Sequence, residues 1–289
     1  MAVALLGLAL TGASAQEENL IYHHPLGNTE VVLLSDAQNE NAPDPLIGAS
    51  EEILKTFVPT GKAKGAMNVF LLKLGGKKIL VDTAMGIRLI DNLKKEGIAP
   101  EEIDIILITH MHGDHIGGLT KEGKACFPKA QVYISKKEYE YWTNKEYIAS
   151  LPEAQRRSFN NVETALKPYE GRITLFEPND IEHMTELIPN VKSIATYGHT
   201  PGHTSYLVEQ GGDQLFIWGD LVNITAVQVP HPELATRYDV DPKQAAETRA
   251  HVLDYLAKQG MSVAGMHVGF PAMGKLVPTD KGLVLSFFE

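Results

Sequence analysis

The sequence predicts an α+β fold in which two β-rich halves form one sandwich-like domain. Each half carries a glycine-marked hairpin between apolar runs, and segments with helix-capping signals lie between and after the expected strands. No internal repeat, low-complexity tract or linker interrupts the chain of 289 residues, of which 44% are hydrophobic. We therefore expect residues 16–289 to form a single domain.

The first half is expected to begin with a hairpin. Apolar runs predict its strands at residues 69–74, 78–82, 103–108 and 131–134. Gly75-Gly76 marks the hairpin turn, and Gly97 is the expected C-cap of a helix over residues 87–96. Ser135 and Glu138 have the spacing of a capping box, which predicts another helix after the last of these strands.

The second half follows the same plan. Apolar runs predict strands at residues 191–197, 207–208 and 215–218. Gly211-Gly212 lies between the last two and marks a second hairpin. Asp241 and Pro242 have the residue types of an N-cap and a first helical position, and Gly260 is expected to end that helix.

Two long segments depart from this alternation. Residues 37–64 are polar and interrupted by prolines, and residues 139–169 are rich in aromatic side chains amid charges. Segments of this length are often functional lids, so the aromatic helical insertion could shape an apolar substrate pocket. The alternative is that its rings pack the insertion onto the body of the domain.

The N-terminus predicts a signal peptide over residues 1–15. Residues 3–10 are apolar, and Ala13-Ser14-Ala15 resembles a cleavage site. The apolar run is too short for an ordinary membrane-spanning helix, and no Lys or Arg precedes it, which leaves a buried N-terminal strand as the alternative. We expect a periplasmic or secreted protein with no membrane partner.

Charge and cysteine content exclude some classes of function. The formal net charge is −10, and no cluster of Lys and Arg exceeds a pair, which argues against a nucleic-acid partner. Cys126 is the sole cysteine, so no intrachain disulfide can form.

Metal-binding side chains concentrate in one short run after the expected strand at 103–108. The run contains His110, His112, Asp114 and His115. His110 and His112 are two residues apart and would point the same way on an extended segment, while the next two side chains can turn toward a second position. A divalent metal is the simplest reason to gather these groups, and one run could serve two adjacent ions.

Three further candidates follow expected strands, each beside glycine or proline. They are His203, Asp220 and His267. Strand ends hold side chains rigidly while the adjoining loops vary, so these positions suit a shared site. A polar loop that is rich in histidine by chance, or a metal-binding protein without catalysis, remain the alternatives.

The ordered pattern of H-x-H-x-D-H, T-P-G-H, G-D and a final His resembles the metallo-β-lactamase superfamily of hydrolases. The order of motifs and the C-terminal segment are most similar to the branch of quorum-quenching lactonases and methyl parathion hydrolase. This resemblance covers most of the chain and implies a four-layer αββα sandwich with the metal site at one edge of the two sheets.

The resemblance also implies site roles. His110, His112 and His203 would bind one metal, Asp114, His115 and His267 the other, and Asp220 would bridge them. Asp82 would support a ligand histidine without touching metal, and His199 would be structural. The other histidines have no ligand-like context: His23, His24, His183, His231 and His251.

The implied chemistry is hydrolysis of a small-molecule substrate. Two divalent ions, with Zn as the default and Mn, Fe or Co as alternatives, would share a bridging hydroxide that opens lactones or cleaves esters, with Asp114 and Asp220 as catalytic residues. Acyl-homoserine lactones and organophosphate triesters are the implied substrates. Asn223 stands where related lactonases often have a Tyr, and it cannot supply a proton.

Two other activities stay open. An exported metallo-β-lactamase is the first alternative, although Asp220 argues against it because many β-lactamases of the superfamily lack this carboxylate. An iron-dependent sulfur oxidoreductase is the second. A homodimer is expected from family analogy.

Overall fold

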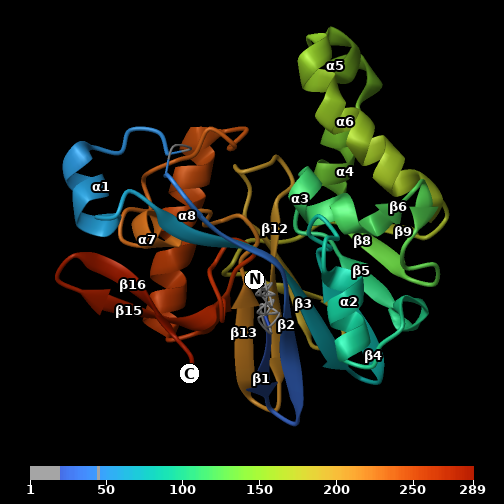
Figure 1. Ribbon diagram of the computed structural model, residues 1–289, viewed down its shortest axis with the longest axis horizontal. Helices are drawn as coiled ribbons and strands as arrows, with labels where there is room; N and C mark the ends of the chain where they lie inside the picture. Colours follow the sequence, from blue (N-terminus) through green and yellow to red (C-terminus); the bar gives the residue numbers. More distant parts are fainter. Residues whose placement is uncertain (1–19, 44–45) are drawn as a thin grey trace, which may run out of the picture.

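The computed structural model describes residues 20–43 and 46–289 and shows two seven-stranded sheets packed face to face. The first has the strand order β1-β2-β3-β4-β5-β8-β9, and the second runs from β10 to β16 in chain order. Helix α8 lies on one side of the sheets, and α2, α4 and α6 lie on the other (Figure 1). The expected α+β class and αββα sandwich are confirmed. The expected signal peptide at 1–15 lies outside the described residues.

The strands of the first sheet are β1 (Ile21–Leu26), β2 (Thr29–Asn41), β3 (Ala63–Leu74), β4 (Lys77–Val81), β5 (Ile105–Leu107), β8 (Gln131–Ser135) and β9 (Ile173–Phe176). Those of the second are β10 (Thr185–Ile188), β11 (Val191–Ala195), β12 (Thr204–Gln210), β13 (Asp213–Ile217), β14 (Ser262–Ala264), β15 (Met273–Thr279) and β16 (Gly282–Phe287). A separate small hairpin consists of β6 (Thr120–Lys121) and β7 (Lys124–Ala125).

The α-helices are α1 (Glu51–Phe57), α2 (Leu89–Lys95), α3 (Gly113–Ile116), α4 (Lys136–Thr143), α5 (Lys145–Ser150), α6 (Glu153–Leu166), α7 (Thr225–Gln228) and α8 (Pro242–Gln259). Short 3-10 helices lie at Pro100–Glu102, Gly117–Leu119 and Lys167–Tyr169. Among the described residues, no helix has both the length and the apolar character needed to cross a bilayer.

The core has two parts because successive side chains on a strand point to opposite faces. On β2, Val31 and Leu33 belong to the cluster between the sheets, whereas Val32 and Leu34 belong to the cluster under α2 and α6. All four side chains are fully buried, which explains why this strand is apolar without alternation.

Both expected hairpins are present. Gly75-Gly76 joins β3 to β4, and both residues have positive φ (56° and 76°), as a two-residue turn of this kind requires. Gly211-Gly212 joins β12 to β13. The expected helix at the C-terminal end is also confirmed: the Asp241 side chain accepts a hydrogen bond from the Gln244 amide, and Gly260 ends α8 in a left-handed conformation.

The capping box expected at Ser135 and Glu138 is wrong. Helix α4 begins at the expected place, but the Ser135 side chain makes no capping hydrogen bond. Glu138 turns inward instead and is 1% exposed. Its hydrogen bonds go to loops that lie near the site, which sequence spacing alone does not reveal.

The two long segments are only partly loops. Strand β2 continues to Asn41 and pairs with β3 from Ala63, so the ends of segment 37–64 belong to a two-stranded arm, and α1 lies between them in sequence. In the segment 139–169, the rings of Trp142 and Phe159 pack with one another at 4.7 Å between centroids. Tyr141 and Tyr147 join this cluster, so these rings hold the helical insertion together.

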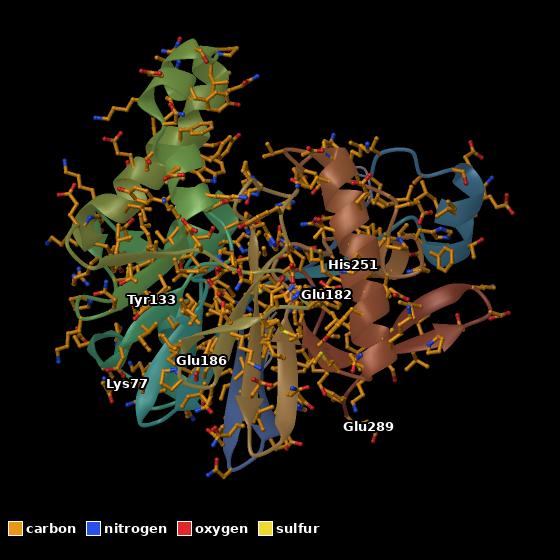
Figure 2. All side chains as sticks on the ribbon, turned by 180° about the vertical axis from the view of Figure 1, so that it is seen from behind. Lys77, Tyr133, Glu182, Glu186, His251 and Glu289 are labelled. Atoms are coloured by element: carbon orange, nitrogen blue, oxygen red, sulfur yellow. The ribbon has the colours of Figure 1, made fainter. Side chains whose placement is uncertain are left out.

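The surface of α8 carries one of the histidines without a ligand-like context. The Nε2 atom of His251 lies 2.7 Å from a carboxylate oxygen of Glu182, and both side chains are largely exposed. Figure 2 shows the two residues beside each other on this face. This contact is a surface ion pair of small expected effect on stability.

Candidate metal centre

One edge of the two sheets gathers metal-binding side chains from four loops. His110, His112, Asp114 and His115 follow β5, His199 follows β11, Asp220 follows β13 and His267 follows β14. Six of them belong to the set expected from the sequence, and His199 is an addition. Ligand atoms in this region form two groups, within each of which all atoms lie within 4.8 Å of one another.

The first group consists of His110, His112, His199 and Asp220. The Nδ1 atom of His112 lies 3.0 Å from the Nε2 atom of His110 and 3.0 Å from the Nε2 atom of His199. The Asp220 Oδ2 atom lies 3.3 Å from His199 Nε2. Three imidazole nitrogens and one carboxylate oxygen therefore converge on one point.

The second group consists of Asp114, His115 and His267. The Nε2 atom of His267 lies 3.5 Å from Asp114 Oδ2 and 3.1 Å from Asp220 Oδ2. The other oxygen of Asp220, Oδ1, lies 3.1 Å from His115 Nε2. Asp220 thus contacts both groups, the position expected of a bridging carboxylate.

Hydrogen bonds fix which nitrogen of each histidine faces the cluster. His115 donates from Nδ1 to Asp82, and His199 donates from Nδ1 to Asp239, both at 2.7 Å. His267 donates from Nδ1 to the carbonyl oxygen of Ala66 at 2.8 Å. Because a neutral imidazole carries one proton, each Nε2 keeps a free lone pair that points into the cluster. The supporting role expected for Asp82 agrees with this contact.

The structure places His199, rather than His203, among the grouped ligand atoms. His203 is fully buried outside both groups. Its Nδ1 atom contacts the hydroxyl of Thr196 at 2.8 Å, and its Nε2 atom accepts a hydrogen bond from the Asp220 amide at 2.9 Å. In this arrangement both ring nitrogens of His203 have partners within the chain. His203 thus holds the Asp220 amide, and its ring centroid lies 5.2 Å from that of His110.

Gly219 makes this arrangement possible. It has a positive φ of 59°, and an added Cβ would lie 2.6 Å from His203 Nε2. A glycine before Asp220 therefore lets the His203 ring reach the Asp220 amide. The glycine of the G-D motif thus helps to position Asp220.

The cluster contains buried polar atoms that other groups in the chain do not satisfy. His115 Nε2 and Asp220 Oδ1 are shielded from solvent and, although they lie 3.1 Å apart, are not aligned for a hydrogen bond with one another or any other group. Buried polar atoms are normally paired, so two such atoms facing one another suggest a missing partner. A donor set of imidazole nitrogens and carboxylate oxygens suits divalent ions.

The electrostatics of the cluster also favour positive charge between its carboxylates. Burial, followed by the charge of His199, lowers the pKa of His112 to about 3. Burial opposes protonation of His199 as well, but its contacts with Asp220 and Asp239 raise the pKa of that imidazole to about 9. The neighbouring carboxylates thus attract positive charge to this point, either the proton of His199 or a divalent ion that displaces it.

Two buried charged residues that sequence patterns did not indicate, Asp239 and Arg249, support the cluster without belonging to it. Asp239 holds His199, and the Arg249 guanidinium lies 3.6 Å from the other Asp239 oxygen. Arg249 also donates to the carbonyl oxygens of Leu221 and Leu234 at 2.5 and 2.7 Å. The sequence does carry one signal for this pair, because Arg249 falls on the buried face of α8 and a buried arginine needs partners.

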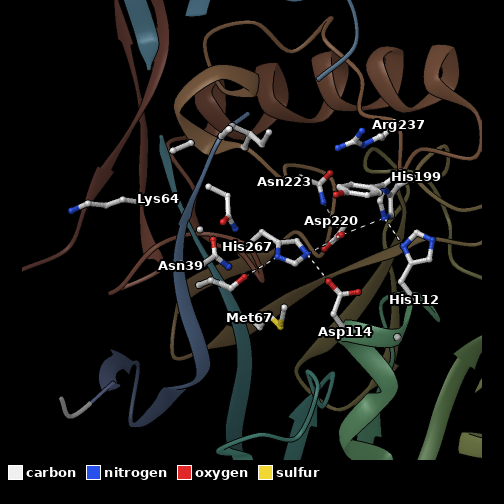
Figure 3. Close-up of a pocket in the computed structure, with 18 of the residues that line it drawn as sticks. Asn39, Lys64, Met67, His112, Asp114, His199, Asp220, Asn223, Arg237 and His267 are labelled. Carbon is white, nitrogen blue, oxygen red and sulfur yellow. Dashed lines mark hydrogen bonds and ion pairs between the residues drawn. The ribbon is translucent and has the colours of Figure 1, made fainter. Parts of the chain in front are cut away.

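A cavity of about 760 Å³ opens onto the cluster (Figure 3). His112, Asp114, His199, Asp220 and His267 line its floor. The remaining walls carry mainly amides, cations and small or apolar side chains: Asn39, Asn41, Ala42, Ala63, Lys64, Ala66, Met67, Ser158, Asn223, Ile224, Arg237 and Tyr238. None of the aromatic rings from residues 139–169 lines this cavity. The rings pack the helical insertion instead, which was the alternative expected for this segment.

Sequence comparison shows the family. A family model described as the metallo-beta-lactamase superfamily matches residues 64–257. The chain therefore belongs to the metallo-beta-lactamase superfamily, in agreement with its αββα architecture and with the order of its His and Asp motifs.

Individual relatives are hydrolases by name. An N-acyl homoserine lactonase of Bacillus cereus is 30% identical over 156 residues, which are 53% of this chain and 53% of the relative. The match thus spans about half the length of that relative. A solved hydrolase of the beta lactamase superfamily, AbOPH, is 31% identical with a TM-score of 0.82, over 93% of this chain and 98% of the other.

A second solved structure, AidC, is described as a dizinc quorum-quenching lactonase in complex with a product. It is 26% identical to this chain with a TM-score of 0.81, and the similarity covers 93% of this chain and 98% of AidC. Both structural relatives thus share nearly the whole described fold.

Proposed function

We propose that this protein is a dinuclear metal-dependent hydrolase that opens lactones or cleaves related esters. The observation that carries this proposal is the position of Asp220, whose two oxygens contact both groups of ligand atoms. The names of the relatives AidC and the Bacillus cereus enzyme support lactones as the substrate class.

The proposed ligands differ at one position from the set that the sequence predicted. His110, His112 and His199 would hold one ion, Asp114, His115 and His267 the other, and Asp220 both. Zinc is the proposed metal, since imidazole and carboxylate ligands suit it and AidC is a dizinc enzyme by description. When bound, two such ions polarise a carbonyl oxygen and lower the pKa of water toward neutrality.

The chain's own residues orient this site. Asp82, Asp239 and the Ala66 carbonyl hold three histidines with Nε2 facing the cluster. The amide of Asn223 donates to Asp220 Oδ2 at 2.8 Å, which restrains the carboxylate that spans both groups. Preorganised ligands of this kind leave little reorganisation to be done during the reaction.

The walls of the cavity indicate a small, partly polar substrate. Met67, Ile224 and Tyr238 supply apolar surface, and Asn39 and Asn41 supply amides that can hydrogen-bond a substrate carbonyl or amide. An ester or lactone with a polar group close to the scissile bond would use both kinds of surface.

A second candidate activity is the cleavage of organophosphate triesters. The small number of hydroxyl groups in the cavity that could protonate a leaving group favours it. Asn223 cannot supply a proton, and the hydroxyls among the described cavity-lining residues are those of Ser158 and Tyr238. Substrates whose leaving group needs no protonation, such as aryl phosphotriesters, would depend least on a proton donor.

The test is hydrolysis of a lactone panel by purified protein of known metal content, with nitrocefin and methyl paraoxon measured beside it. Lactone turnover well above the other two, with about two metals per chain, is the expected result. Dominant nitrocefin turnover would instead identify a β-lactamase. Bound iron with no hydrolysis of any substrate would overturn the hydrolase proposal and favour the sulfur oxidoreductase.

Export and self-association complete the proposal. Cleavage after Ala15 would place the mature protein in the periplasm or outside the cell, and N-terminal sequencing of protein from each cell fraction tests this. An N-terminus at residue 1 in exported protein would contradict it. Sedimentation of the purified protein tests the proposed homodimer.

A further inference from the structure

Glu138 is a buried charged residue outside both groups of ligand atoms. It lies in the first turn of α4, on the helical side of the first sheet, and is 1% exposed. No Lys or Arg pairs with it among the described residues. A buried carboxylate without a cation persists only if hydrogen bonds satisfy it.

Four hydrogen bonds satisfy the Glu138 carboxylate, and they divide between its two oxygens. Oε1 accepts from the Met111 amide at 2.9 Å and from the Trp142 indole at 2.7 Å. Oε2 accepts from the Thr200 hydroxyl at 2.6 Å and from the Gly202 amide at 3.0 Å. Three of the partners are N–H groups, which can only donate, and the Thr200 hydroxyl is placed to donate as well. Burial raises the pKa of Glu138, but these four hydrogen bonds oppose that effect and favour an ionised carboxylate that accepts on both oxygens.

Each oxygen therefore serves a different loop of the metal centre. Met111 lies between His110 and His112, whereas Thr200 directly follows His199. These two loops come from different sheets, yet His112 Nδ1 and His199 Nε2 approach to 3.0 Å. Glu138 bonds both loops at once.

Two further contacts make this connection stiff. An added Cβ on Gly202 would lie 2.1 Å from the Glu138 amide nitrogen, so the loop rests directly on the start of α4. Trp142, held by Glu138 Oε1, packs edge to face on the His112 ring, with centroids 5.6 Å apart. Glu138 thereby restrains the His112 ring as well as the backbone before it.

We propose that Glu138 is a positioning residue of the metal centre, which sets the separation between the loop of His110 and His112 and the loop of His199. The inference rests on the proposed metal centre. It adds that the affinity for the ion held by these three histidines depends on a carboxylate that does not touch it.

The substitution Glu138→Gln tests this with a minimal change in size. A glutamine offers one oxygen, so its NH₂ group must face the two donors of either the Met111 side or the Thr200 side. One loop would be released, and we expect the dissociation constant for Zn²⁺ to rise about 10- to 100-fold, as for other groups that orient metal ligands. Thr200→Val removes a single hydrogen bond and should give a smaller rise in the same direction.

Glu140→Gln is the matched control, because it removes the same charge from an exposed position on α4. The measurement is competition for Zn²⁺ against a chelator at a temperature far below unfolding, with the absorption spectrum of the Co²⁺-loaded protein as a report on ligand geometry. Weaker binding and an altered spectrum in the Glu138 and Thr200 variants, with an unchanged control, would support the inference.

A purely structural role would give a different result. Lower thermal stability of the apo-protein, with Zn²⁺ affinity and Co²⁺ spectrum equal to those of the control, would overturn the positioning role while leaving the metal centre intact. Failure of the unaltered protein to bind Zn²⁺ or Co²⁺ would overturn the metal centre itself and the inference with it.

Discussion

The two histidines of Gly198-His199-Thr200-Pro201-Gly202-His203 differ in the groups that their ring nitrogens contact. Both are buried, and both follow the same strand. His199 has one nitrogen engaged by Asp239 and the other in the cluster, whereas both nitrogens of His203 are engaged within the chain. The residue with the free lone pair is the candidate ligand.

Substitutions at these two histidines should have opposite signatures. His199→Ala should weaken binding of one metal by more than about 100-fold, since a direct ligand matters at least as much as the groups that orient it. His203→Ala should keep the metal content and lose about 1–3 kcal/mol of unfolding free energy, because the Asp220 amide loses its acceptor. Metal analysis and urea unfolding of both variants check this; metal loss in the His203 variant alone would reverse the assignment.

Asp220→Ala should leave the fold intact but loosen one metal and reduce turnover by orders of magnitude. The reason is that Asp220 contacts both ligand groups and no other described carboxylate does so. Asp254→Ala, which removes an exposed carboxylate of α8, is the control. Full activity with two metals bound in the Asp220 variant would contradict the bridging role.

At the scale of elements, the start of helix α2 depends on a residue from a distant strand. The Asp36 carboxylate, from β2, accepts hydrogen bonds from the amides of Ile87, Arg88 and Leu89 at 2.6–2.9 Å. Arg88, at the N-cap position, makes no side-chain cap. The first sheet therefore supplies the cap that the helix sequence lacks.

Removing this remote cap should destabilise the protein. Asp36→Ala leaves buried helix-start amides without acceptors, and we expect a loss of about 2 kcal/mol in the free energy of unfolding. Asp91→Ala removes an exposed carboxylate from the first turn of the same helix and should cost little. Urea denaturation of the two variants measures both effects, and equal losses would show that Asp36 acts only through its charge near the helix.

At the scale of the whole molecule, the site exists only where the two sheets meet at one edge. Loops after β5 of the first sheet and after β11, β13 and β14 of the second supply its ligand atoms. Neither sheet alone supplies all the ligand atoms of the site. The first group already combines His112, which follows a strand of the first sheet, with His199 and Asp220, which follow strands of the second sheet.

Metal removal should therefore weaken the whole fold. Chelation would leave buried carboxylates and imidazoles without a shared cation, and an ion present at 100 times its dissociation constant contributes about 2.7 kcal/mol to stability. We expect the melting temperature to fall on treatment with a chelator and to recover on addition of Zn²⁺. An unchanged melting temperature in protein shown to lose its metal would contradict a centre that links the sheets.

Much of the architecture was predictable because its signals are local. Gly75-Gly76 and Gly211-Gly212 specify turns through their backbone freedom, and Asp241, Pro242 and Gly260 delimit α8 through capping. The polar segment at 37–64 was expected to be a long loop, but its two ends pair with one another as parts of β2 and β3. Strand pairing depends on a partner that is distant in sequence, and propensity does not encode that partner.

The same distinction holds at the site. The sequence by itself determined the residue types, their order and their placement at strand ends, and these were sufficient for the family and for six of the seven clustered side chains. Only the tertiary structure grouped His199 rather than His203 with the other ligand atoms, and only it revealed the contacts of Asp239, Arg249 and Glu138. The physical reason is that a ligand's role depends on which hydrogen bonds satisfy its other atoms, and those partners come from elements that meet only in the folded chain.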